Sequence, residues 1–150
     1  MIVRLPRDLS SQAVFSLPED APEVFLRTYE DAAYLYGESG KLVGQILYEG
    51  GGATVSVGDA PSYRVQKHEG SGLSIVPFVP SEKTLSYETF GNLAKANYTL
   101  YEYHPGVVRP EVAARVTQEP LDPTFFYADL SERSNVFRTL LLVVALARIA

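Results

Sequence analysis

Cysteine is absent from this chain of 150 residues, and several other features are missing as well. Without cysteine, the chain has no disulfide bond, no thiolate metal site and no cysteine nucleophile. No segment is a basic block and the net charge is −5, so the electrostatic pattern typical of nucleic-acid binding is missing. We therefore expect no nucleic-acid partner. An acidic chain is also a poor general partner for an anionic membrane surface.

Long apolar runs are missing too. The longest run, residues 140–147, is far below the ~20 residues that a membrane-crossing helix needs. Near the N-terminus, Arg4, Pro6 and Arg7 interrupt any apolar region of the kind found in a secretory signal. These absences predict a cytoplasmic protein without a transmembrane segment. The composition, 46% hydrophobic and 21% charged, is typical of a folded protein, and the length fits a single domain over residues 1–150.

Short β-prone segments separated by turns fill most of the sequence. Glycine and proline recur roughly every 8–12 residues, a spacing typical of β-sandwiches and β-barrels. Residues 107–117 fit either a strand or a short helix that begins near Pro110, and we favour the strand. The other expected strands are 13–17, 24–29, 33–36, 41–49, 53–58, 62–67, 73–79, 83–89, 96–103 and 124–130, with a loop at 90–92.

The last segment, residues 136–150, breaks this pattern. Its length and its leucine and alanine content predict a helix over about 135–149. Ser131, Ser134 and Asn135 are the candidates for the N-cap, since each side chain is able to accept a hydrogen bond from the first turn.

This helix is apolar on every side between Arg138 and Arg148, and a helix of that kind is buried all round. The preceding residues supply about ten to twelve strands, enough to surround it. We therefore expect a mainly β fold, a closed or nearly closed antiparallel β-barrel of about 10–12 strands around a hydrophobic C-terminal helix. The two arginines must reach a barrel mouth or pair with carboxylates, for which Asp129 and Glu132 are the candidates.

Two segments carry a resemblance to a known family. Residues 34–44 read as an aromatic strand, a short turn ending in Gly40 and Lys41, and a second strand, and residues 125–130 are followed by the apolar helix. This arrangement resembles the tubby C-terminal-like superfamily, which includes tubby domains, phospholipid scramblases and LURP-one-related proteins, and it is most similar to the small bacterial members. The resemblance covers nearly the whole chain and implies a barrel around a central helix. Tubby domains bind phosphoinositides through basic residues, but the resemblance assigns none of those positions here.

Two glycine-containing segments invite a phosphate-binding interpretation. Residues 37–41 end like a P-loop, but Leu35 stands where that motif needs glycine and Leu42 where it needs serine or threonine. A hairpin turn is therefore the favoured interpretation. Gly50–Gly52 is able to let a backbone approach a ligand closely, but we favour a flexible hairpin loop.

The two histidines, His68 and His104, are the other candidates for chemistry. His68 is close in sequence to Glu69 and Ser71, but neighbours on a strand point to opposite faces, so the sequence predicts no catalytic triad. Neither histidine has the spacing of a metal ligand. We predict no catalytic, cofactor-binding or metal-binding residue, and both histidines are expected to have ordinary surface roles.

The tyrosines Tyr98, Tyr101 and Tyr103 are able to line a ligand cleft, although a place in the core or on the barrel surface is favoured. The leading hypothesis for function is a non-enzymatic binding or scaffolding module for a membrane lipid or a protein partner. The alternative is a carrier of a small hydrophobic ligand, in which strands and the helix enclose a cavity as in helix-grip folds. An enzyme with dispersed catalytic residues is the least favoured hypothesis. No cofactor is expected, and the sequence does not indicate which residues bind a lipid or how many chains associate.

Overall fold

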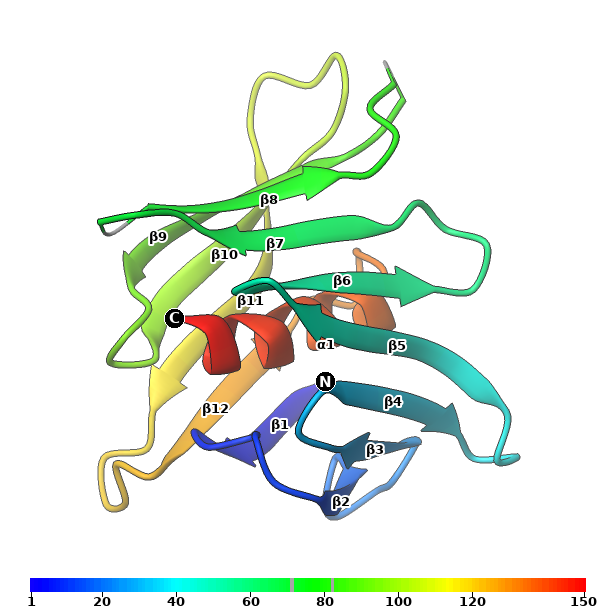
Figure 1. Ribbon diagram of the computed structural model, residues 1–150, viewed down its shortest axis with the longest axis vertical. Coiled ribbons are helices and arrows are strands. Elements are labelled where there is room, and N and C mark those ends of the chain that lie inside the picture. Colours follow the sequence, from blue (N-terminus) through cyan, green and yellow to red (C-terminus); the bar gives the residue numbers. More distant parts are fainter. Residues whose placement is uncertain (71, 82) are drawn as a thin grey trace.

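Two antiparallel sheets and one helix make up the described part of the chain, residues 1–70, 72–81 and 83–150 of a computed structural model (Figure 1). The five-stranded sheet has the order β1 (Ile2–Pro6), β12 (Phe125–Leu130), β11 (Glu111–Gln118), β10 (Asn97–Tyr103) and β9 (Ser86–Asn92). The seven-stranded sheet follows the sequence: β2 (Ala13–Leu17), β3 (Val24–Thr28), β4 (Ala32–Gly37), β5 (Leu42–Glu49), β6 (Gly52–Val57), β7 (Tyr63–Lys67) and β8 (Leu73–Pro77). The prediction of a mainly β fold is confirmed.

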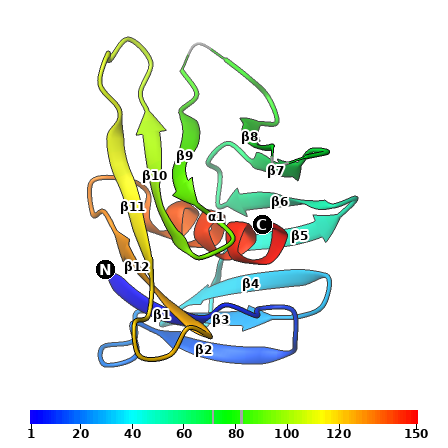
Figure 2. The same cartoon turned by 90° about the vertical axis from the view of Figure 1, so that its left-hand side faces the viewer.

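Helix α1 (Val136–Ile149) lies between the two sheets, as the side view in Figure 2 shows. It contacts β5, β6 and β7 of one sheet and β11 and β12 of the other. Every side chain from Leu140 to Leu146 has a relative exposure of 0%, so the apolar segment is buried on all sides as predicted. Asn135 is the N-cap, and its side chain accepts a hydrogen bond from the backbone N–H of Arg138.

The expected barrel is not closed, and this part of the prediction is wrong. The two sheets are separate hydrogen-bonded units, with β1 and β9 at the edges of one and β2 and β8 at the edges of the other. The edges approach each other at β8 and β9, which lie side by side but are not hydrogen-bonded into one sheet (Figures 1 and 2). A sandwich-like arrangement with a helix in its core describes the fold.

Several strand predictions need correction at their ends. Residues 107–117 are not a helix, because β11 begins at Glu111 and pairs with both β10 and β12. The loop expected at 90–92 is the end of β9, where Gly91 pairs with Tyr98. A Cβ at Gly91 would lie 2.6 Å from the carbonyl oxygen of Asn97, so only glycine lets the strands approach this closely.

Strand β1 was not expected, because Arg4 and Pro6 interrupt its apolar character. Its alternation is nevertheless regular, since Val3 and Leu5 point into the core and are at most 1% exposed. Within the described residues, no helix combines the length and apolar character needed to cross a membrane.

Candidate functional site

Two polar sites lie at the two ends of α1. Arg138, in the first turn of the helix, belongs to the first of them. It is 7% exposed, and its Nε donates a hydrogen bond of 3.0 Å to the hydroxyl of Tyr87. Its guanidinium carbon lies 5.4 Å from the centre of the Tyr63 ring, within cation–π range. The predicted pairing with Asp129 or Glu132 is wrong, since neither forms an ion pair with Arg138. Both carboxylates are exposed to solvent, whereas the guanidinium points into the protein.

Tyr87 connects this arginine to a buried carboxylate. Its hydroxyl donates a hydrogen bond of 2.8 Å to Oε2 of Glu102, which is 1% exposed. Burial raises the pKa of Tyr87 far above its ordinary value, despite the opposing effect of the nearby Arg138 charge. The hydroxyl therefore keeps its proton and stays a donor. In this way the negative charge of Glu102 and the positive charge of Arg138 are joined through a neutral hydroxyl rather than by direct contact.

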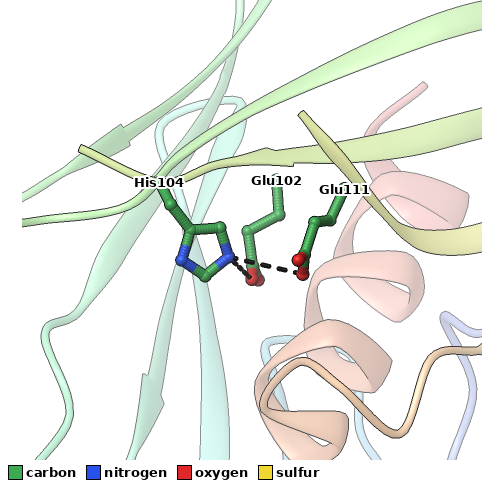
Figure 3. A group of neighbouring side chains, drawn as sticks. All are labelled: Glu102, His104 and Glu111. Carbon is green, nitrogen blue, oxygen red and sulfur yellow. Dashed lines mark hydrogen bonds and ion pairs between the residues drawn. The ribbon is translucent and has the colours of Figure 1, made fainter. Parts of the chain in front are cut away.

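His104 and Glu111 complete a cluster with Glu102, which we call the Glu-His-Glu cluster (Figure 3). Oε1 of Glu102 lies 2.8 Å from Nε2 of His104, and Oε2 of Glu111 lies 3.7 Å from the same nitrogen. The register of β10 and β11 places Glu102 directly opposite Glu111. Candidate ligand atoms of all three residues lie within 4.8 Å of one another. Two carboxylates and an imidazole thus converge on one point near the surface.

The second polar site is a cleft of about 700 Å³ at the C-terminal end of α1. Its walls come from the start of the chain, the β9–β10 turn, β11, β12 and the end of the helix. Tyr98 belongs to these walls and is 5% exposed, and its buried hydroxyl has no hydrogen-bond partner among the described residues. The lining residues are Pro6, Arg7, Asp8, Leu9, Ser10, Leu93, Ala94, Ala96, Tyr98, Val116, Pro123, Thr124, Phe125, Phe126, Ala147, Arg148 and Ala150. We call this the helix-end cleft.

Arg148 stands between the helix-end cleft and a second opening beside it. Its Nη1 donates a hydrogen bond of 2.9 Å to the carbonyl oxygen of Tyr29, and its guanidinium carbon lies 4.1 Å from the centre of the Tyr48 ring. Burial raises the pKa of Tyr48 to about 12, while the Arg148 charge acts in the opposite direction. As predicted, this arginine reaches an opening of the fold rather than the apolar core.

Gly50–Gly52 lines the opening on the other side of Arg148, with a volume of about 740 Å³. Gly50 and Gly51 form the turn between β5 and β6 and both have positive φ, and Gly52 begins β6. The predicted hairpin at 37–41 is confirmed, since Gly37 and Lys41 are bonded through their backbones between β4 and β5. Neither glycine segment shows a phosphate-binding loop that begins a helix.

His68 lies away from both sites, and Tyr101 and Tyr103 lie outside the helix-end cleft. Nε2 of His68 is 2.8 Å from Oγ of Ser74, and this exposed histidine has no hydrogen bond to Glu69. Ser71, the third residue of the triad considered above, is outside the described residues. Tyr101 and Tyr103 are half-buried on β10, with the Tyr103 hydroxyl donating to Glu88, so of the three tyrosines only Tyr98 lines the helix-end cleft.

The Glu-His-Glu cluster was missed because its residues are joined by strand pairing. Glu102 lies on β10 and His104 directly follows the end of that strand, two residues further on, which is a usable signal. Glu111 joins them only through the register of β10 with β11, and the sequence left residues 107–117 open between strand and helix.

Comparison with family models, curated proteins and solved structures gives no match for this chain.

Proposed function

We propose that this protein is a non-enzymatic binding module that takes a single-chain amphipathic lipid, such as a fatty acid, into the helix-end cleft. The observation that carries the proposal is the cleft itself, whose volume of about 700 Å³ lies within the usual range of small-molecule sites. This proposal combines the lipid and the hydrophobic-ligand hypotheses in one place on the molecule.

The walls of the cleft suit an apolar chain with a polar head. Leu93, Phe125 and Ala147 are partly exposed and provide apolar surface. Arg7 and Arg148 provide two positive charges against the one side-chain carboxylate of Asp8. A carboxylate head group is able to approach these guanidinium groups, while the acyl chain replaces water along the apolar walls.

The same lining supports binding rather than catalysis. None of its residues is a histidine. The Asp8 carboxylate accepts hydrogen bonds from the hydroxyl and the backbone N–H of Ser10, and these bonds lower its pKa. The carboxylate is therefore ionised and engaged in its own turn at neutral pH, which makes it unsuited to donate a proton to a bound ligand.

A relationship to the tubby C-terminal-like superfamily is part of the proposal. It is supported by the C-terminal helix enclosed between antiparallel sheets, as the resemblance implies. A cytoplasmic place for the protein is likewise proposed, and cell fractionation with an antibody against the chain tests it.

A fluorescent fatty acid tests the binding function. We expect a dansylated fatty acid to bind one site per chain and to be displaced by unlabelled fatty acid. Ala94→Trp fills the rim of the cleft at an exposed position and should weaken binding about tenfold or more, equal to about 1.4 kcal/mol. Val108→Trp is the matched control, because Val108 is 94% exposed and lies outside the cleft.

Two results would contradict this function. One is the absence of saturable fatty-acid binding by a protein that unfolds cooperatively. The other is an equal loss of binding in Ala94→Trp and Val108→Trp. Sedimentation with vesicles rather than binding of the free fatty acid would indicate recognition of a membrane surface instead.

A further inference from the structure

The Glu-His-Glu cluster brings together the kinds of atoms that bind transition metals. One imidazole nitrogen and two carboxylate groups lie with their ligand atoms within 4.8 Å of one another. Zinc accepts histidine nitrogen at ~2.0–2.1 Å and carboxylate oxygen at ~2.0–2.2 Å, so ligand atoms around one ion lie ~3–4 Å apart. The distances of 2.8 and 3.7 Å from Nε2 of His104 to the two carboxylates are close to that spacing.

Glu102 and Glu111 lie opposite each other, and His104 lies within ion-pair distance of both carboxylates. Like charges directly opposite each other on neighbouring strands destabilise a sheet, and burial of Glu102 strengthens the repulsion. Arg138 does not supply a compensating positive charge by contact, because its Nε is bonded to the Tyr87 hydroxyl. A cation at the cluster would lie between the two carboxylates and remove the repulsion.

Glu102 is also oriented as a metal ligand would be. Its Oε2 accepts the hydrogen bond from Tyr87, whose hydroxyl is in turn held by Arg138, so the carboxylate has one fixed orientation. Its Oε1 is the oxygen that faces His104. Metal-binding carboxylates usually have such an outer hydrogen bond, and it lies on the side away from the proposed ion here.

We propose that Glu102, His104 and Glu111 form a binding site for a divalent transition metal, best suited to Zn²⁺. A mixed nitrogen and oxygen ligand set favours Zn²⁺ over Ca²⁺ and Mg²⁺, which prefer oxygen ligands alone. The side chains of His104 and Glu111 are 36% and 48% exposed, so the ion has a path from solvent and a position for a water ligand. This site is at the other end of α1 from the helix-end cleft, and its existence does not depend on lipid binding.

Metal titration of the intact 150-residue chain tests the proposal. We expect one Zn²⁺ per chain in isothermal titration calorimetry at neutral pH, and a rise in the unfolding temperature when Zn²⁺ is added. Co²⁺ should bind in its place and give a visible absorption band. Glu111→Gln should weaken Zn²⁺ binding about tenfold or more while leaving the fold intact, because this side chain is half exposed. His104→Ala should weaken it further.

Matched controls separate a built site from general surface binding. His68→Ala removes the other histidine, which is exposed and bonded to Ser74, and Glu88→Gln removes an exposed carboxylate on the neighbouring strand β9. Both variants should bind Zn²⁺ as the parent protein does. If they lose as much affinity as His104→Ala and Glu111→Gln, or if the parent protein binds no Zn²⁺ while remaining folded, the cluster is a metal-free ion pair and the proposal is overturned.

Discussion

At the scale of single residues, the buried tyrosines differ in what their hydroxyl groups contact. The Tyr87 hydroxyl joins Glu102 to Arg138, and the Tyr63 hydroxyl donates to the carbonyl oxygen of Leu85 at 2.7 Å. The Tyr98 hydroxyl contacts no partner among the described residues, although it is equally hidden from water. A buried hydroxyl without a partner destabilises the fold, whereas a bonded one contributes to stability.

Removal of these hydroxyl groups should therefore have opposite effects. Tyr87→Phe should lower the free energy of unfolding by about 2 kcal/mol, since it leaves a buried carboxylate and a buried guanidinium without their shared partner. Tyr98→Phe should be neutral or stabilise the protein by up to about 1 kcal/mol. Urea unfolding of the two variants measures the difference. A larger loss of stability in Tyr98→Phe than in Tyr87→Phe would show that the hydrogen bonds are assigned wrongly.

At the scale of elements, the contact between α1 and β5 depends on one glycine. Gly44 faces the helix, and a Cβ there would lie 2.7 Å from Cδ1 of Leu141 and 2.8 Å from the carbonyl oxygen of Ser56. The carbonyl belongs to the neighbouring strand β6, so it cannot move away without disturbing the sheet. The absence of a side chain at Gly44 is what lets the helix lie close to the sheet.

Substitution of this glycine should separate the two elements. We expect Gly44→Ala to lower the free energy of unfolding by about 1–3 kcal/mol through overpacking. Gly37→Ala is the matched control, because the nearest atom to its Cβ would be Cγ2 of Val43 at 3.4 Å, an ordinary contact. Thermal unfolding of both variants measures the effect. Equal stability of the two variants would mean that the helix does not lie against β5 at this point.

At the scale of the whole molecule, both sheets use α1 as their common core. The residues of β6 and β12 that face inward, such as Val55 and Phe126, join one hydrophobic cluster with Leu140 and Leu142 of the helix. The helix packs against β5, β6 and β7 of one sheet and β11 and β12 of the other. The two sheets should therefore unfold together, as a single cooperative unit.

Deletion of residues 136–150 tests this dependence. We expect the shortened chain to lose cooperative unfolding and to bind hydrophobic dyes, since the inner faces of both sheets become exposed. Hydrogen exchange should show loss of protection in β5 and in β12 alike. A truncated chain that keeps a sharp thermal transition would disprove the central place of the helix.

Features carried by a local pattern could be predicted from the sequence. The enclosed helix follows from the uninterrupted apolar run 140–147, and the inward face of β3 follows from the alternation of Val24, Leu26 and Thr28, all of which are buried. The failure of the barrel to close could not be read locally, because it depends on whether the edge strands of the two sheets pair with each other. The Glu-His-Glu cluster could not be read for a similar reason, since it requires the pairing of β10 with β11.

The position of α1 also has a consequence for how the protein is made. Residues 136–150 are synthesised after both sheets, yet they fill the space between them. A growing chain that already contains both sheets therefore still lacks the helix at the centre of its core, and the apolar sheet faces that α1 covers stay open to contact with other chains. Folding must wait until this segment has left the ribosome, so the interval just before its release is when the nascent chain is most exposed to aggregation and to capture by chaperones.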